Sequence, residues 1–256
     1  MIHSTALVDP SASLEEGVSV GPFTVIGPDV EIGHGTVIGP HVVLRGPTRI
    51  GIENRIFQFA SIGEDPQDKK YRGETTRLEI GDRNVIREYS TIHRGTVQDA
   101  SLTRVGNDNL LMAYTHVAHD CVIGNGTILA NGASLAGHVQ VDDFAILGGF
   151  SLVHQFCKIG RESFSGMGSV ISRDVPPFVM IGGSPTKPRG INSVGMERRG
   201  YDAEAILKVK RAFKILYKSK FKLEGAIEHL ESMAKDSPEI VPILDFLKQS
   251  GRSIIR

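Results

Sequence analysis

Residues 26–44 read IGPDVEIGHGTVIGPHVVL, and an aliphatic residue stands at every sixth position of this stretch. The four are Ile26, Ile32, Ile38 and Leu44, and glycine follows each of the first three. A period of six fits neither the 3.6-residue repeat of a helix nor the two-residue alternation of a half-exposed strand. It predicts a short strand, a corner and another short strand, with the aliphatic side chain pointing inward and glycine easing the corner.

The same period covers most of residues 1–186, which predicts a mainly-β fold for them. It resembles the hexapeptide-repeat family, in which three hexads form one triangular coil of about 18 residues in a left-handed parallel β-helix. The hand of the helix follows from this resemblance. Ser165 breaks the pattern, which otherwise holds at Ile2, Val8, Leu14, Val20, Ile26, Ile32, Ile38, Leu44, Ile50, Ile56, Ile62, Ile80, Ile86, Ile92, Val105, Leu111, Val117, Ile123, Leu129, Leu135, Val141, Leu147, Val153, Ile159 and Ile171.

Two polar segments and a tail depart from the repeat. Segments at about 68–79 and 97–104 lack the aliphatic residue and are expected to loop out of the coil, where binding residues are common. Residues 187–256 are expected to form an α-helical C-terminal domain, with Asp202 capping a helix that reaches about Ser219. A second helix is expected from Leu223 and a third from Ser237 and Pro238.

The charge of the chain is unevenly spread, although its formal net charge is zero. Residues 1–186 hold 14 Lys and Arg against 20 Asp and Glu, whereas residues 187–256 hold 15 against 9. The basic excess of the tail is either a solvated helical face or a docking patch for an acidic partner or a phosphate. Aromatic residues make up 6% of the chain and do not interleave with basic ones, so no nucleic-acid partner is expected.

Composition also favours a cytoplasmic protein. The N-terminus has no secretory pattern, and no apolar run approaches the roughly 18 residues that cross a membrane. The two cysteines, Cys121 and Cys157, fall at small inward positions two coils apart. A separation of roughly 9–10 Å is too long for a disulfide, so both are expected to be buried free thiols.

The histidines carry the strongest sign of chemistry. Residues 115–122 read THVAHDCV, and the hexads that start at residues 117, 135 and 153 fall on one face of successive coils. We therefore expect His119, His138 and His154 to be stacked neighbours, with His116 at the adjoining corner. The other histidines are expected to be isolated surface residues: His3, His34, His41, His93 and His229.

Two chemistries could use such a cluster, and a noncatalytic β-helix scaffold is a third possibility. One is zinc chemistry, as in the γ-class carbonic anhydrases, but the His-x2-His spacing here differs from their His-x4-His arrangement. The other is acyl transfer, in which a neutral imidazole takes a proton from a hydroxyl that attacks a thioester. Asp120 directly follows His119, and a carboxylate can orient an imidazole and support its charged form. Acyl transfer without metal or cofactor is therefore the favoured hypothesis.

Longer motifs then resemble one enzyme family over almost the whole chain. The segments IGEDPQDKKYRGETTRLEIGDRNVIRE, TIHRGTV, NLLMAYTHVAHDCVIGN, SLAGHVQVDDFAILGG, VHQFCKIG, ERRGYDAEAI and the closing SGRSIIR are similar to the UDP-N-acetylglucosamine O-acyltransferases. Members of that family are homotrimers of left-handed β-helices. They transfer a 3-hydroxyacyl group from acyl carrier protein to the glucosamine 3-hydroxyl of UDP-N-acetylglucosamine, which begins lipid A synthesis; a 3-amino acceptor occurs in some relatives and remains open here.

The resemblance implies a role for each matched residue. His119 matches the general base, Asp120 its orienting partner, and Gly137 the glycine whose N–H faces the thioester oxyanion. Arg198 and Arg199 match residues that reach the UDP, which suits guanidinium groups. Val194 stands where the family often has a glutamate, so one contact to the nucleotide is expected to be missing. The remaining matches are substrate-binding positions: Gln67, Asp68, Lys70, His116, His138, His154, Gln155 and Asn192.

Met167 matches the position that closes the far end of the acyl-chain cleft in the family. It lies 48 residues beyond His119, which is about 2.7 coils and hence about 13 Å along the axis. An extended alkyl chain advances roughly 1.25 Å per carbon, since its bonds are about 1.5 Å long. The sequence therefore predicts a preference for a 3-hydroxyacyl chain of about ten carbons.

Overall fold

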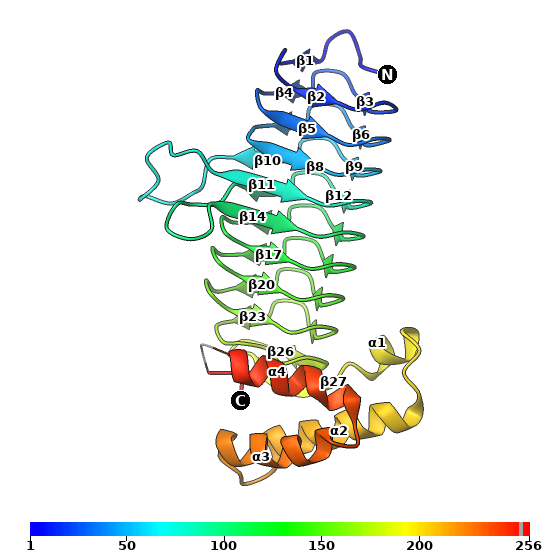
Figure 1. The fold of residues 1–256 in the computed structure, drawn as a ribbon, viewed down its shortest axis with the longest axis vertical. Coiled ribbons are helices and arrows are strands. Elements are labelled where there is room, and N and C mark those ends of the chain that lie inside the picture. Colours follow the sequence, from blue (N-terminus) through cyan, green and yellow to red (C-terminus); the bar gives the residue numbers. More distant parts are fainter. Residues whose placement is uncertain (251–252) are drawn as a thin grey trace.

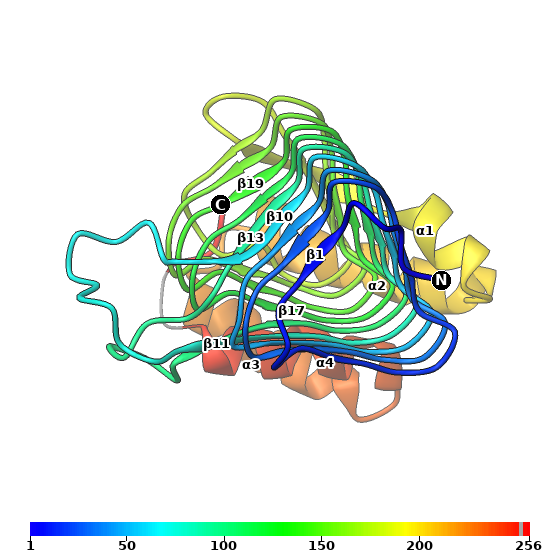
Figure 2. The ribbon, with the colours of Figure 1, turned by 90° about the horizontal axis from the view of Figure 1, so that it is seen from above.

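The computed structural model is a three-sided prism of stacked coils with helices at its C-terminal end (Figure 1). Seen along its axis, the chain winds through three flat sides and three corners, which gives a triangular outline (Figure 2). The structure describes residues 1–250 and 253–256; Gly251 and Arg252, which belong to the closing SGRSIIR, lie outside the described residues. The fold is the expected left-handed parallel β-helix.

Each side of the prism is a sheet of very short strands, one from each coil. Sheet 1 contains β1 (Leu7–Val8), β4 (Val25–Ile26), β7 (Val43–Leu44), β10 (Ser61–Glu64), β13 (Thr91–His93), β16 (His116–Val117), β19 (Ser134–Leu135), β22 (Leu152–Val153) and β25 (Val170–Ile171). Sheet 2 contains β2 (Ser13–Leu14), β5 (Val30–Ile32), β8 (Thr48–Ile50), β11 (Arg77–Ile80), β14 (Leu102–Val105), β17 (Val122–Ile123), β20 (Gln140–Val141) and β23 (Lys158–Ile159). Sheet 3 contains β3 (Ser19–Val20), β6 (Val37–Ile38), β9 (Arg55–Ile56), β12 (Val85–Ile86), β15 (Leu110–Leu111), β18 (Ile128–Leu129), β21 (Ile146–Leu147), β24 (Phe164–Ser165), β26 (Val179–Gly182) and β27 (Lys187–Ile191).

From Val20 onward the six-residue aliphatic positions form the core of the prism, as the sequence predicts, whereas Ile2 in the first coil is 51% exposed. Ile26, Leu44 and Leu135, for example, are 0–1% exposed, and strand pairing places Ile26 beside Leu44. Ser165, the exception in the repeat, is buried as well, and its hydroxyl lies 2.7 Å from that of Ser151. A buried hydroxyl needs such a partner, since leaving it unpaired costs about 1–3 kcal/mol.

The three corners of the coils form three edges along the prism. Edge 1 joins sheet 1 to sheet 2, edge 2 joins sheet 2 to sheet 3, and edge 3 joins sheet 3 back to sheet 1. Many corner residues have positive φ although they are not glycine, which is uncommon for side chains that carry a Cβ. On edge 3 such residues stack with ring centroids 4.8–5.3 Å apart, in the order Phe23, His41, Phe59, Tyr89 and Tyr114.

Both interruptions of the repeat leave the prism at edge 1, where Figure 2 shows them projecting to the left. The first excursion covers residues 65–76 and the second residues 94–101. The predicted loops were therefore too long at their ends: residues 77–79 belong to β11 and residues 102–104 to β14, and these two strands pair in parallel. The strand ends are fixed by hydrogen bonding between coils, which a pattern of single side chains does not show.

The C-terminal residues begin with a strand. Residues 187–191, expected in the helical domain, form β27, which pairs antiparallel with β26. Helices α1 (Ser193–Arg198), α2 (Ala203–Lys218), α3 (Leu223–Ala234) and α4 (Val241–Gln249) follow, with a 3-10 turn η1 (Pro238–Ile240) before α4. Asp202 caps α2 by accepting a hydrogen bond from the Ala205 N–H, as predicted. Within residues 1–250 and 253–256, every helix is too short or too polar to span a bilayer.

The depth of burial along one side of the prism gives the first prediction. Leu135 is fully buried in β19, whereas Leu152 in the adjacent β22 is 50% exposed. Replacing a buried leucine with alanine removes contacts and leaves a cavity, which typically costs about 2–5 kcal/mol. Leu135→Ala should therefore lower the free energy of unfolding by that amount in chemical denaturation. The matched variant Leu152→Ala should change it by less than about 1 kcal/mol, and equal losses would contradict the assignment of the core.

Candidate active site

The 18-residue spacing of the coils decides which side chains meet on edge 1. His116 pairs with Ser134 and Val117 with Leu135, so Gly137 follows His119 along this edge and His138 follows Asp120. The expected contact between His119 and His138 is confirmed, since their rings meet edge-on with centroids 5.1 Å apart, but the three histidines do not share one register. These histidines occupy three different positions of their hexads, and the ring stacked on His138 is that of Phe156, with centroids 4.4 Å apart.

His119 and Asp120 form a hydrogen-bonded pair. The Nδ1 atom of His119 lies 2.8 Å from Oδ2 of Asp120, and the side chains are 13% and 1% exposed. Because the carboxylate faces Nδ1, the proton of a neutral ring belongs on Nδ1, and Nε2 keeps its lone pair. The ring is therefore prepared to accept a proton at Nε2.

Asp120 is held by more than the histidine. Its Oδ1 accepts a hydrogen bond from the Thr96 N–H at 2.8 Å, and its Oδ2 accepts one from the Thr96 hydroxyl at 2.6 Å. The Asp120 N–H donates to the Thr103 hydroxyl at 2.8 Å. Burial raises the pKa of Asp120, but the hydrogen bonds from His119 and Thr96 outweigh it and leave this pKa below its usual range. Asp120 is thus a carboxylate at neutral pH.

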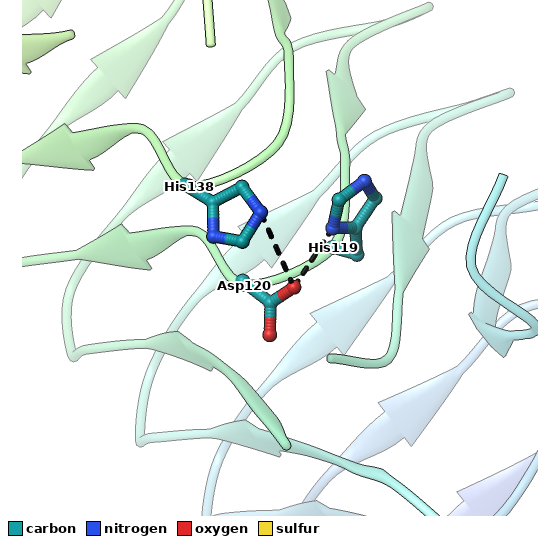
Figure 3. Close-up of side chains that lie close together, drawn as sticks. All are labelled: His119, Asp120 and His138. Atoms are coloured by element: carbon teal, nitrogen blue, oxygen red, sulfur yellow. Dashed lines mark hydrogen bonds and ion pairs between the residues drawn. The ribbon is translucent and has the colours of Figure 1, made fainter. Parts of the chain in front are cut away.

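His138 completes the cluster (Figure 3). Its ring is perpendicular to that of His119, with centroids 5.1 Å apart, and its Nε2 lies 3.8 Å from Oδ2 of Asp120. On the other side of the ring, Nδ1 lies 2.8 Å from Oδ2 of Asp99, which belongs to the second excursion. His138 therefore lies between two carboxylates and rests on Phe156.

Because Gly137 has no side chain, the His119 ring can occupy the space beside it. A Cβ atom at residue 137 would lie only 2.5 Å from Cε1 and 2.8 Å from Nε2 of His119. Any other residue would displace the imidazole from this position. The glycine also brings backbone close to the ring, as the predicted oxyanion role requires.

His116 lies beside the cluster and is partly buried. Its Nδ1 is 2.7 Å from the Thr91 hydroxyl, and its ring contacts that of His93 edge-on, with centroids 5.3 Å apart. Burial, followed by the charges of His93 and His119, lowers the pKa of His116 to about 4. His93 was expected on the surface, and this was wrong: it is 6% exposed, its Nδ1 donates to the Asp65 carbonyl, and burial lowers its pKa.

Both cysteines are buried, and both are thiols. Burial raises the pKa of Cys121 to about 12, so this thiol stays protonated. Neither pairing nor nucleophilic attack by a thiolate is therefore expected of Cys121.

The predicted contacts of the first excursion lie outside the histidine cluster. Gln67 and Lys70 are exposed, and the Asp68 carboxylate accepts a hydrogen bond from the Lys70 N–H at 2.9 Å. His154 and Gln155 are exposed on edge 1, one coil beyond Gly137, and His154 Nδ1 lies 3.2 Å from the Gln155 carbonyl oxygen. These residues share edge 1 with the cluster.

The remaining predicted residues lie on the other two edges. Arg199 packs over the ring of Phe144 on edge 2, with Cζ 3.4 Å from the ring centroid, and Arg198 ends α1 beside it. Met167 is 84% exposed at a corner of edge 3. Asn192 is 8% exposed and already engaged: it caps α1 through the Gly195 N–H and donates to the Glu162 carbonyl. In Figure 2, α1 and the excursions lie on opposite sides of the prism.

Four residues that the sequence did not single out contact the cluster: Thr96, Asp99, Thr103 and Phe156. Phe156 stands 18 residues after His138, so its position could have been found from the coil length. Thr96 and Asp99 lie where the repeat is interrupted, and no periodic signal places them.

Known proteins match both parts of the chain. Residues 11–46 and 102–137 match the family model of the bacterial transferase hexapeptide repeat, and residues 174–255 match that of UDP-N-acetylglucosamine O-acyltransferase, domain 2. An acyl-[acyl-carrier-protein]–UDP-N-acetylglucosamine O-acyltransferase of Stutzerimonas stutzeri is 55% identical over 100% of this chain and 99% of its own length. The chain belongs to the UDP-N-acetylglucosamine O-acyltransferase family.

Solved structures support the same assignment. The LpxA structure of Acinetobacter baumannii superimposes with a TM-score of 0.98 at 49% identity, covering 100% of this chain and 99% of the other. The UDP-N-acetylglucosamine acyltransferase of Arabidopsis does so with a TM-score of 0.85 at 33% identity, covering 100% of both chains. The protein is therefore an acyltransferase of the lipid A pathway family, and the histidine cluster on edge 1 is its candidate active site.

The low pKa of His116 predicts how stability depends on pH. The unfolded chain binds a proton at this residue near pH 6.5, whereas the folded chain does so only near pH 4. The stability of the wild type should therefore fall as pH drops from 6.5 to 4, with a slope of at most about 1.4 kcal/mol per pH unit from this group. His116→Gln should flatten the fall in urea titrations, and exposed His34→Gln should not; identical slopes in all three proteins would contradict the assignment.

Proposed function

We propose that the protein transfers a 3-hydroxyacyl chain from acyl carrier protein to the glucosamine 3-hydroxyl of UDP-N-acetylglucosamine, with His119 as general base. Support comes first from the names of the relatives, which carry both substrates. The single structural observation behind the mechanism is the 2.8 Å contact between His119 Nδ1 and the Asp120 carboxylate. It leaves Nε2 free to take a proton.

The reaction can be written on these atoms. The sugar hydroxyl gives its proton to Nε2 of His119 while its oxygen attacks the thioester carbonyl carbon. The carbonyl oxygen becomes negative, and the N–H of Gly137 is proposed to face it; such a donor is typically worth about 10²–10³ in rate. The C–S bond then breaks, the ester forms, and the imidazolium returns the proton to the leaving sulfur. Asp120 stabilises the imidazolium between the two transfers.

The distribution of residues over the edges supports a homotrimer. His119 lies on edge 1, Arg199 on edge 2 and Met167 on edge 3, so one chain cannot bring them to one substrate. A three-fold assembly of prisms would place edge 1 of each chain beside the part of a neighbouring chain that carries edges 2 and 3. We propose that each complete site lies between two subunits and that Arg198, Arg199 and the backbone near Asn192 reach the UDP across this interface.

Arg198 is the better candidate of the two arginines for the diphosphate. Both arginines are exposed, but Arg199 is also stacked on Phe144, whereas Arg198 ends α1. Val194, where the family often carries a glutamate, is 56% exposed and can supply no charged contact. Gln67, Asp68, Lys70, His116, His138, His154 and Gln155 remain proposed substrate contacts, and two buried thiols fit the proposed cytoplasmic location.

The base assignment gives a direct prediction. His119→Ala should fold like the wild type but lose about 10²–10⁴-fold in turnover, because general-base catalysis contributes that much. Turnover would be measured with 3-hydroxyacyl carrier protein and UDP-N-acetylglucosamine, and also with a 3-amino sugar nucleotide to establish the acceptor. His154→Ala, on the same edge but away from Asp120, is the matched control and should lose less. Retention of more than a tenth of wild-type turnover in His119→Ala would rule His119 out as the base.

Zinc chemistry, the alternative from the sequence, has one observation in its favour. His119, Asp120 and His138 each offer a ligand atom, and these atoms lie within 4.8 Å of one another. Ligands about 2.0–2.1 Å from a tetrahedral ion would be about 3.4 Å apart, which is longer than the 2.8 Å hydrogen bond between His119 and Asp120. We favour acyl transfer, which uses that hydrogen bond as it stands. One zinc per subunit together with bicarbonate activity would support carbonic anhydrase, and acyl transfer that survives a chelator would oppose it.

Acyl-chain length provides a separate prediction. The proposed cleft from His119 to Met167 accommodates about ten carbons, and each methylene left outside forgoes about 0.8 kcal/mol of burial. Met167→Gly should move the preferred donor toward about fourteen carbons without abolishing turnover, because this exposed methionine fills space. The measurement is a series of acyl carrier protein donors of increasing length. The same ranking in wild type and variant would show that Met167 merely packs a coil corner.

A further inference from the structure

One short segment touches both the first excursion and the catalytic pair. Residues 93–99, called the tether here, leave sheet 1 at the end of β13 and enter the second excursion. Residues 93, 94 and 96 are at most 8% exposed, which is unusual for a polar segment outside the repeat. Its first residues contact the first excursion, and its later residues contact Asp120 and His138.

The beginning of the tether holds the base of the first excursion. Arg94 donates from Nη1 to the carbonyls of Gly46 and Gly63 at 2.7 and 2.8 Å. Its Nη2 forms an ion pair with Asp65 and a 3.1 Å hydrogen bond with the Tyr71 hydroxyl. A buried guanidinium requires such partners, so Asp65 and Tyr71 are kept in place by strong, charge-assisted bonds.

The middle of the tether holds the carboxylate of the catalytic pair. Thr96 supplies both its N–H and its hydroxyl to Asp120, at 2.8 and 2.6 Å. Only one residue separates Thr96 from Arg94, and that residue is Gly95. A Cβ at position 95 would lie 2.1 Å from the Leu102 nitrogen, so the chain is packed tightly here and has little room to adjust.

The far end of the tether holds His138. Asp99 extends from the second excursion, and its Oδ2 lies 2.8 Å from Nδ1 of the ring. The Asp99 N–H donates back to the Thr96 carbonyl at 3.2 Å, which joins the two contacts into one local turn. The Asp99 side chain is 52% exposed, and its carboxylate contacts the histidine.

We propose that the tether is a positioning element that couples the first excursion to the catalytic pair, with Thr96 and Asp99 as positioning residues for Asp120 and His138. The proposal rests on the function proposed above, because that function makes residues 67–70 substrate contacts. When those residues close on substrate, Asp65 and Tyr71 transmit the constraint through Arg94 to Thr96. The orientation of Asp120, and through it of the His119 ring, then depends on the state of the first excursion.

The first experiment compares turnover in tether variants. Thr96→Val removes the hydroxyl and should lower kcat about tenfold or more, whereas Thr96→Ser keeps it and should retain most of the rate. Asp99→Ala should lower kcat about threefold to tenfold, because the ring of His138 loses its anchor. Gln98→Ala, an exposed neighbour in the same segment, is the matched control and should match wild type. In each case KM should change less than kcat.

The pH profile separates positioning from a general loss of structure. Asp120 faces His119, His138 and the two donors of Thr96, and Asp99 faces His138. Losing the Thr96 hydroxyl takes one donor from Oδ2 of Asp120, so more of the carboxylate's charge is left to stabilise the imidazolium of His119, and the acid side of the kcat profile should move to higher pH in Thr96→Val. Gln98→Ala should leave the profile where it is.

The coupling itself is tested by a double-mutant cycle. Tyr71→Phe removes one bond to Arg94 in the first excursion and should lower kcat although residue 71 does not contact the catalytic pair. Combined with Thr96→Val, it should cost at least about threefold less than the product of the two separate losses. A purely multiplicative result would overturn the proposal, as would unchanged kcat in Thr96→Val.

Hydrogen exchange tests the coupling through the tether independently of the proposed acyl transfer. In Thr96→Val without substrate, backbone amides of residues 65–76 should exchange at least about threefold faster, and in Gln98→Ala they should not. If the wild type transferred no acyl group, the proposed function would fail while this measurement would still decide the coupling. Unchanged exchange in Thr96→Val would count against the tether even in a fully active enzyme.

Discussion

The stacking of one coil on the next, through parallel hydrogen bonds and inward aliphatic side chains, is the constraint on which the rest of the structure depends. Val25 pairs with Val43 and Val43 with Ser61, and each step is eighteen residues. Because most coils close in the same eighteen residues, a position on an edge is fixed by its number in the chain wherever the repeat is uninterrupted. Polar residues eighteen apart then form rows along the outside, and one such row on edge 1 holds the candidate active site.

The two excursions show how residues can be inserted without disturbing the stacking of the coils. Ser61 pairs with Thr91, thirty residues later, and Thr91 pairs with His116, twenty-five residues later. The extra twelve and seven residues leave the prism at edge 1 and return without shifting the aliphatic positions. Ile62, Ile92 and Val117 therefore remain aligned in the core while Thr96 and Asp99 reach back to the cluster. Rigid coils supply fixed positions, and the inserted residues supply the contacts between them.

How much could be predicted from the sequence follows from the same division. The six-residue period places Ile26, Leu44 and Leu135 in the core and His119 with Asp120 on an edge, because each of these obeys the period. The contact of His138 with Phe156 also follows the period, because the two residues are eighteen apart. It is missed when whole hexads are compared and the position within each hexad is ignored. The burial of His93 and the role of Thr96 could not be read this way. Their neighbours come from an interruption of the repeat, where position depends on tertiary hydrogen bonds.

The two ends of the prism differ in a way that bears on how copies of this chain avoid one another. At the C-terminal end, β27 turns antiparallel and α2–α4 cover the last coil (Figure 1). At the N-terminal end the first coil has no coil above it, and Ile2 and Leu7 are 51% and 67% exposed. Unpaired strand edges of this kind can recruit another chain, and parallel stacking would extend them indefinitely. The first strands contain only two residues each, and the N-terminal amine turns inward to bond the Val18 carbonyl at 2.8 Å. The charged amine at this end disfavours the approach of a second prism, and helices cover the other end, so growth into a fibre is disfavoured at both.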